Sequence, residues 1–153
     1  MYDIRDVLQR GIEIAAKRKT LYEKAKENEP DLRNQMIYNM MIRALERDET
    51  YYKQIMLSIS DAMAEAIDFG IYDKISSLVN QFMRTLIPPS SHDRKEIVGY
   101  IIEQEKSIYA LAIDIQGRMV TDDLTSMTIA YYVMTEIIED KKQLIDKFEQ
   151  LVR

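Results

Sequence analysis

The sequence offers few places at which a helix would have to end. Only four glycines and three prolines occur among its 153 residues, whereas proteins built from sheets need many more turn residues to connect their short strands. Between these places, apolar residues recur at steps of three and four, which is the spacing of one face of a helix. The sequence therefore predicts a single all-α domain with helices at about 4–27, 31–68, 72–86, 93–115 and 122–152.

Turn residues indicate how these helices are connected. The Pro30-Asp31 pair suits the first turn of the second helix, and Gly70 is expected to cap a helix at its C-terminus. Ser91 or Asp93 is expected to cap the fourth helix at its N-terminus, just after the clearest break in the chain, Pro88-Pro89. The long segment between the second and fourth helices carries its own helix, which favours a four-helix bundle with one long crossover connection.

Composition excludes several classes of protein. Without cysteine there are no disulfides, iron–sulfur clusters, thiolate zinc sites or thiol nucleophiles. The net charge of −5 argues against nucleic acid as a partner, and no stretch approaches the roughly 18 uncharged apolar residues of a membrane span. The first residues, MYDIRDVLQR, lack the apolar core of a signal peptide, so we expect a cytoplasmic protein that does not bind membranes. The single histidine, His92, is expected to be exposed or to act as a cap.

Four charged residues fall on helix stripes that are otherwise apolar, namely Arg18, Asp48, Glu105 and Lys141. A lone buried charge costs several kcal/mol, so such groups are paired, bind metal or extend to water. The long side chain of Arg18 favours extension to water, whereas Asp48 and Glu105 are too short for this. We therefore expect a shared polar site inside the bundle.

Methionine and tyrosine are both frequent, with ten of each. Each of the pairs Tyr51-Tyr52 and Tyr131-Tyr132 should place one ring inward and one outward, and the outward ring is a candidate for a subunit contact. Several methionines recur at helical spacing and are expected to fill the core or an interface; they are Met36, Met40, Met41, Met127 and Met134.

Two short runs of sequence resemble a known family. The run Ile12-Glu13-Ile14-Ala15-Ala16-Lys17, followed by Leu21-Tyr22-Glu23-Lys24-Ala25, resembles the first helix of rubrerythrin-related members of the ferritin-like superfamily. That helix has an apolar-Glu-apolar-Glu-Lys run with an aromatic pair one to two turns later. The run Ile102-Glu103-Gln104-Glu105-Lys106 resembles their third helix. The resemblance covers most of the chain and implies a ferritin-like four-helix bundle with a long crossover connection that carries an extra helix.

The same resemblance implies a dimetal site whose ligands are largely lost. In the family, the first and third helices each supply a glutamate, and the second and fourth each supply a Glu-x-x-His pair. Glu105 matches the third-helix glutamate, but the first-helix glutamate falls on Ala15. The other positions lack histidine in either of two registers, being Asp48 with Tyr51 and Lys141 with Leu144, or, one residue on, Glu49 with Tyr52 and Asp140 with Gln143.

We therefore predict a buried ion-pair cluster where the family holds its metals, with Lys141, and Arg18 if it turns inward, pairing with Asp48 and Glu105. A lysine among carboxylates supplies the positive charge that a metal would bring. On this interpretation the chain has no cofactor and is a structural or interaction module. The resemblance favours a homodimer, while the sequence identifies no other protein partner.

Two alternatives remain open at this stage, and with them the question whether the chain is an enzyme. Iron or manganese can bind to oxygen ligands alone, so a divergent metal site with oxidase or peroxide-handling activity would use Glu105, Asp48, Glu49 and Glu13. A helical adaptor unrelated to ferritins fits the same pattern. Neither a phosphate-binding loop nor a nucleophile motif is present, so no catalytic or cofactor-binding residues are predicted.

Overall fold

The computed structural model describes residues 1–152, and this part of the chain is all-helical. The first helix has the predicted bounds, and residues 1–152 form five α-helices, with a short 3₁₀ helix before the last. The elements are α1 (Ile4–Glu27), α2 (Leu32–Ser58), α3 (Phe69–Thr85), α4 (Arg94–Met119), η1 (Thr125–Met127) and α5 (Ile129–Leu151).

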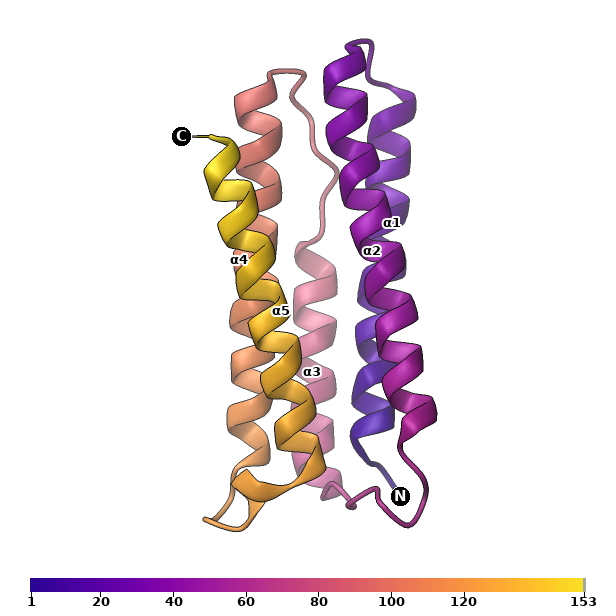
Figure 1. Cartoon of the computed structure of the whole chain (residues 1–153), viewed down its shortest axis with the longest axis vertical. Helices are drawn as coiled ribbons and strands as arrows, with labels where there is room; N and C mark the ends of the chain where they lie inside the picture. Colours follow the sequence, from indigo (N-terminus) through magenta and orange to yellow (C-terminus); the bar gives the residue numbers. More distant parts are fainter. Residues whose placement is uncertain (153) are drawn as a thin grey trace.

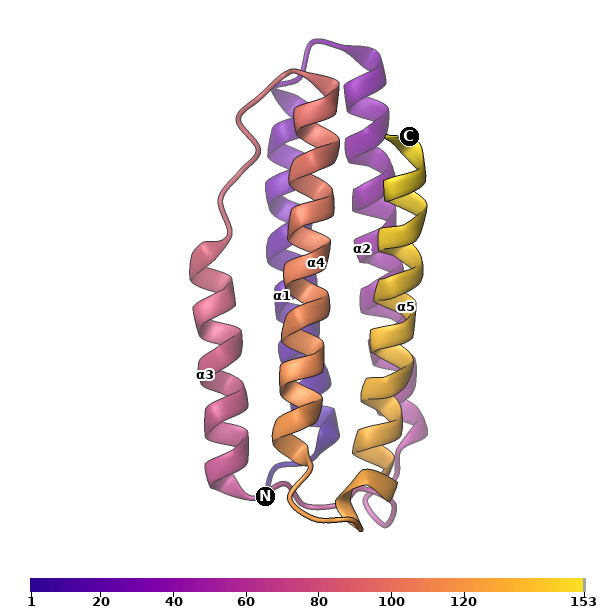
Figure 2. The same cartoon turned by 90° about the vertical axis from the view of Figure 1, so that its left-hand side faces the viewer.

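Four long helices run side by side as two antiparallel hairpins, α1 with α2 and α4 with α5 (Figure 1). The segment between the hairpins returns the chain to the end at which α2 began, first through α3 and then through an extended stretch. As a result, α2 and α4 run in the same direction. Figure 2 shows α3 outermost, α1 and α4 in the middle, and α2 and α5 on the opposite side. In keeping with this order, α3 packs on α1 and α4.

The second helix is shorter than the sequence predicts, because it ends at Ser58 and not at Asp68. Hydroxyl groups compete with the helical hydrogen bonds at this point: Ser58 Oγ donates to the carbonyl of Ile55 at 2.6 Å. The following segment crosses the end of the bundle, where the backbone N–H of Ile67 donates to the carbonyl of Tyr2 at 2.7 Å. A contact with the N-terminus thus replaces the last turns of the predicted helix.

Other helix ends also differ from the predictions. Gly70 is not a C-terminal cap but lies in the first turn of α3, where its N–H donates to the side chain of Asp68 at 3.0 Å. The fourth helix continues past its predicted end at residue 115 to Met119. The last helix begins at Ile129 and not at residue 122, because the side chain of Asp122 caps a separate turn. Of Ser91 and Asp93, the two residues predicted as the N-terminal cap of α4, Asp93 is the cap, and its side chain accepts from the N–H of Glu96.

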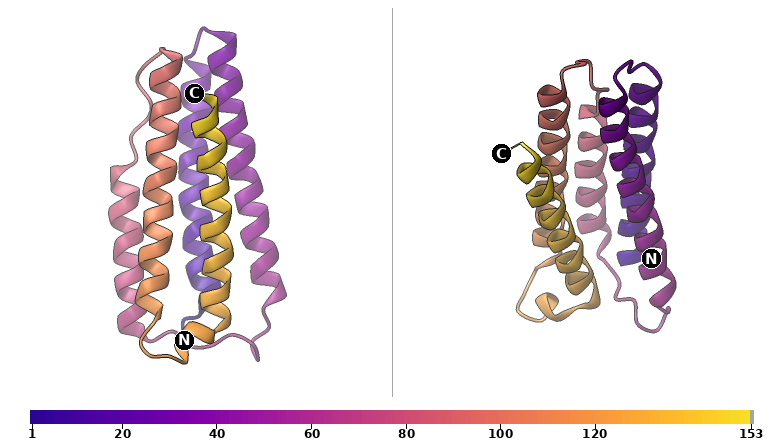
Figure 3. Two further views of the ribbon diagram at one scale, coloured as in Figure 1. Left: turned by 60° about the vertical axis from the view of Figure 1, so that its left-hand side comes forward. Right: turned by 45° about the horizontal axis from the view of Figure 1, so that its top comes forward.

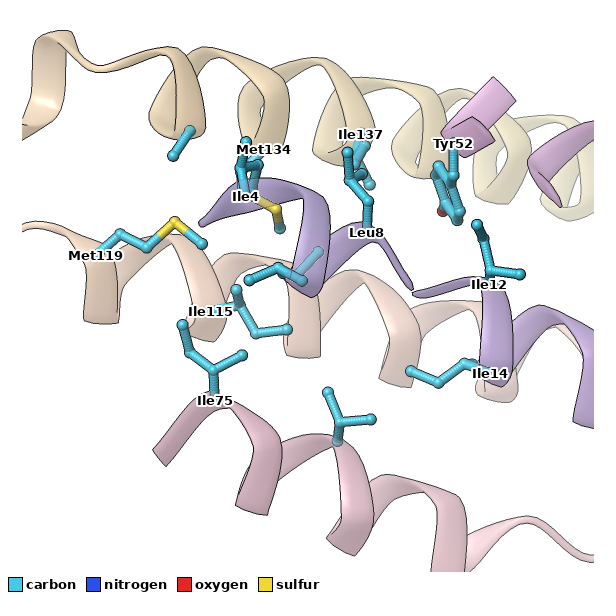
Figure 4. Packing of buried hydrophobic residues seen from close by; sticks show 14 of the residues in the cluster. Ile4, Leu8, Ile12, Ile14, Tyr52, Ile75, Ile115, Met119, Met134 and Ile137 are labelled. Carbon is cyan, nitrogen blue, oxygen red and sulfur yellow. The ribbon is translucent and has the colours of Figure 1, made fainter. Parts of the chain in front are cut away.

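Buried apolar side chains form two clusters, one toward each end of the bundle. The cluster nearer the N-terminus draws on all five helices, and Figure 4 shows its residues converging from them. The cluster at the other end includes Tyr22, Tyr38, Leu45, Ile101 and Phe148. Among the helices that the structure describes, none is both long enough and apolar enough to cross a membrane.

Candidate functional site: a buried charge cluster beside an interior cavity

A layer of four charged side chains separates the two apolar clusters. Along each long helix, one charged residue stands between a residue of one cluster and a residue of the other, as Glu105 does between Ile101 and Ile108. We call these residues the buried charge cluster; they are Arg18 of α1, Asp48 of α2, Glu105 of α4 and Lys141 of α5. Each of the four helices of the bundle therefore brings one charge to the same level.

The first ion pair joins α1 to α4. Arg18 Nη2 donates to Glu105 Oε1, and both side chains are excluded from water, with 1% and 0% of their surface exposed. The expectation that the side chain of Arg18 extends to water is therefore wrong. Its Nε donates to Gln104 Oε1 at 2.7 Å, which also accepts the hydroxyl of Tyr22 at 2.9 Å. Because these groups fix the guanidinium from two sides, Arg18 points into the core.

The second ion pair joins α2 to α5. Lys141 Nζ donates to Asp48 Oδ2, and the side chain of Lys141 is only 2% exposed whereas that of Asp48 is 11% exposed. Tyr52 lies one helical turn beyond Asp48 and is also buried, and burial raises the pKa of its hydroxyl to about 12. The phenol of Tyr52 therefore stays protonated at neutral pH.

The two carboxylates of the cluster are shifted in opposite directions. Burial raises the pKa of Glu105, but the charges of Arg18 and Lys141 outweigh this effect, so its pKa lies below the usual value of 4.5. For Asp48 the effect of burial is the larger one, and its pKa lies above the usual value of 3.8 in spite of Lys141. With two cations and two carboxylates, the cluster is neutral as a whole.

Replacing Glu105 by glutamine should therefore change how stability depends on pH. The low pKa of Glu105 in the folded chain contributes stability above the unfolded value of 4.5, and this contribution is lost as the pH falls through the folded pKa. The stability difference between wild type and Glu105→Gln should thus shrink from about pH 6 to about pH 3. Asp48→Asn should show the opposite trend, because a raised pKa contributes stability in acid that is lost as the pH rises. Urea unfolding at both pH values measures both trends, and parallel trends would contradict the assignment.

The residues of the alternative metal site are not gathered into one. Glu13 pairs with Arg10 at 2.7 Å on a half-exposed part of α1, and Glu49 is only half-buried beside Asp48. Residues 1–152 contain no group of three or more histidine, cysteine, aspartate and glutamate side chains placed to hold a metal ion. The donor set does not fit the dimetal centre that the family resemblance implies, since Lys141 is bonded to Asp48 and Arg18 to Glu105.

An interior cavity of about 70 Å³ lies beside the buried charge cluster. Apolar side chains form most of its wall, and Arg18, Asp48 and Lys141 contribute the polar part. Several of its apolar residues are labelled in Figure 4, namely Leu8, Ile14, Tyr52, Ile115, Met134 and Ile137. Sequence reasoning missed this cavity. The available signal was the spacing of two small residues, Gly11 and Ala15, on the inward stripe of α1.

A second hollow, of about 310 Å³, lies between α2 and α5 on the side of the bundle that faces away from α3. Its walls carry both signs of charge, with Arg47 on α2 and Asp140 and Lys147 on α5. We call this hollow the α2–α5 groove. Asp48 lines both the groove and the interior cavity, so the ion pair of Asp48 with Lys141 stands between them.

The single histidine lies outside this site, as the sequence predicts. The His92 side chain is mostly exposed, and its Nδ1 lies 2.8 Å from Oε2 of the buried Glu29. Asn34 Nδ2 donates both to Glu29 Oε1, at 2.9 Å, and to the carbonyl of His92, at 2.8 Å. These contacts join the turn between α1 and α2 to the start of α4.

The tyrosine pairs are divided between core and surface. Tyr52 is buried and Tyr51 is half-buried, with its hydroxyl 3.2 Å from Glu136 Oε2. In the other pair, Tyr132 is exposed and Tyr131 is half-buried. Of the five methionines expected in the core or an interface, two are buried, Met41 and Met134, and three are exposed, Met36, Met40 and Met127.

Comparison with known proteins finds no match for this chain. No protein-family model, no curated protein and no solved structure matches the chain.

Proposed function

We propose that this chain is a ferritin-like four-helix bundle without a redox metal centre, which serves as a structural or interaction module and pairs with a second copy of itself. The observation that carries the proposal is the buried charge cluster. Its two cations occupy the level at which the resemblance expects metals, and each is bonded to a carboxylate. A metal would have to displace Lys141 and Arg18 and leave two cations unpaired in the core, at a cost of several kcal/mol.

The order and direction of the helices support the ferritin-like part of this proposal. Bundles of that kind have two helical hairpins joined by one long crossover. Here the crossover contains α3, and α2 and α4 run in the same direction (Figure 3).

An apolar stripe on α2 supports the pairing of two copies. Leu32, Met36 and Met40 follow one another at intervals of four residues and therefore lie on one helix face, where 69%, 59% and 49% of their surface is exposed. Exposed apolar patches of this kind mark surfaces that bind other proteins. Methionine side chains adapt well to such contacts.

Native mass spectrometry of the untagged protein, expressed with added iron and manganese, tests both parts of the proposal. We expect the mass of two chains with no bound metal. The double variant Met36→Lys/Met40→Lys should shift the protein to the mass of one chain, because it places charges in the apolar stripe. Leu57→Lys is the matched control, since Leu57 is exposed near the other end of the same helix, and it should leave the dimer intact.

Each part of the proposal has its own contrary result. One or two metal ions per chain would refute the metal-free centre and favour the alternative of an iron or manganese protein. A single-chain mass for the wild type at micromolar concentration would refute the pairing. Equal masses for the two lysine variants would refute the assignment of the α2 stripe.

A further inference from the structure

The interior cavity has the size and lining of a site for one small molecule. Its volume of about 70 Å³ is several times the roughly 10–15 Å³ that one water molecule needs, and about half that of an engineered cavity that binds benzene. Small side chains keep this space open on two sides, with Gly11 and Ala15 on α1 and Ala112 on α4. A Cβ atom on Gly11 would lie 3.3 Å from Cε2 of the Tyr52 ring, so a larger residue there would press on the cavity wall.

One end of the cavity can hydrogen bond to a ligand. An ammonium group has three N–H donors, and the structure gives Lys141 a single hydrogen bond, to Asp48. The carboxylate of Asp48, which accepts that bond through Oδ2, lines the cavity as well. The polar end of the cavity therefore combines spare donors on Lys141 with a carboxylate acceptor on Asp48, whereas most of the cavity wall is apolar.

These properties select the ligand by its chemistry. An apolar wall excludes ordered water from most of the cavity, because a buried water needs two to four polar partners. The charge cluster is neutral, so a charged ligand would bring an uncompensated charge into the core. A short-chain alcohol fits both conditions, since its carbon chain contacts the apolar wall and its hydroxyl both accepts from an ammonium and donates to a carboxylate.

The α2–α5 groove adjoins the cavity. Asp48 is the residue that lines both the groove and the cavity, and its side chain keeps some exposure to water. Lys141, its partner, also lines the cavity. The ion pair of Asp48 with Lys141 therefore lies where the groove and the cavity adjoin.

We propose that the interior cavity binds a small neutral alcohol, which enters from the α2–α5 groove past the ion pair of Asp48 and Lys141. This proposal is independent of whether the chain forms a dimer. One bound alcohol would contact both the charge cluster, through its hydroxyl, and the apolar wall of the cavity, through its carbon chain.

Titration with 1-propanol, followed by amide NMR spectra of the full chain, tests the binding site. We expect saturable shifts at the residues that line the cavity and none with glycerol, which has the same three carbons but a hydroxyl on each of them and would leave hydroxyls unpaired against the apolar wall. Ala15→Leu fills the cavity and should abolish the saturable shifts. Ala16→Leu is the matched control, because Ala16 is exposed on the same helix, and it should bind as the wild type does.

A second pair of variants keeps the test valid if Ala15→Leu does not fold. Ala112→Val fills the cavity from α4 and should weaken binding by at least tenfold, while the exposed Ala110→Val should not. Shifts that remain linear in propanol, or binding that survives both filling variants, would overturn the site. For the route, Asp48→Asn weakens the ion pair and should speed exchange of bound propanol. An unchanged exchange rate would overturn entry past Asp48.

Discussion

Replacing Arg18 by methionine should lower the free energy of unfolding by about 3–5 kcal/mol, because it leaves the Glu105 carboxylate buried without its ion-pair partner. Glu105 is fully buried, so water cannot take the place of the guanidinium. Gln104 also loses the Nε donor that it accepts in the wild type. Urea unfolding at neutral pH measures the loss. The exposed Arg43 on α2 provides the control, and Arg43→Met should change stability by less than about 0.5 kcal/mol.

The double variant Arg18→Met/Glu105→Leu should recover most of that loss. Removing both charges eliminates the cost of burying them, and apolar replacements of buried ion pairs are often neutral or stabilising. A double variant as unstable as Arg18→Met alone would show that the loss comes from packing of the Arg18 side chain and not from the unpaired carboxylate.

Phe148→Ala should destabilise the protein by about 3–5 kcal/mol, the range for truncating a buried aromatic side chain. Phe148 is 4% exposed and anchors the last turns of α5 to the apolar cluster that contains Tyr22 and Ile101. Beyond Phe148, the end of α5 is held by the partly exposed ion pair of Glu149 with Lys106 on α4, at 3.1 Å. Hydrogen exchange should therefore accelerate first in the C-terminal turns of α5.

Leu151 supplies the matched control for this variant. It lies three residues further along α5 and is 60% exposed, so Leu151→Ala should have little effect on stability. Equal losses of stability for the two variants would show that the end of α5 contributes nothing to the apolar core. Uniform acceleration of exchange along the whole chain would show that α5 does not open separately.

The buried charges could be located from the sequence, but their partners could not. The stripe of apolar residues around Glu105 and Lys141 predicts that both point inward. Which cation meets which carboxylate depends on how far one helix is shifted along the next, and a single helix carries no such information. The direction of the Arg18 side chain was equally unpredictable from one helix. The side chain is long enough to reach water, and only its contacts with Gln104 and Glu105 on another helix hold it in the core.

The end of the second helix and the cavity lay beyond prediction for different reasons. The residues after Ser58 include Ala62, Met63 and Ala64, which favour helices. The helix stops earlier where the Ser58 hydroxyl bonds to the carbonyl of Ile55 and the segment beyond contacts the N-terminus through Ile67 and Tyr2. The cavity arises where side chains from five helices fail to fill a shared space. Ala15 signals a missing ligand in the sequence, but its neighbours across the bundle decide whether the space stays open.

The placement of the four charges also selects one docking arrangement of the hairpins over its mirror-like alternative. The first hairpin carries Arg18 and Asp48, the second carries Glu105 and Lys141, and both ion pairs run from one hairpin to the other. If the second hairpin docked with its helices exchanged, α1 would face α5 and α2 would face α4. Arg18 would then meet Lys141, and Asp48 would meet Glu105.

Like charges brought together in this way cost several kcal/mol, whereas the hydrophobic effect is non-directional and does not by itself select between the two arrangements. Apolar stripes drive the association of helices, but they specify poorly which helix packs against which neighbour. The sign of the buried charge alternates from helix to helix around the bundle. This alternation favours the observed order of neighbouring helices, because the exchanged order would place like charges together in the core.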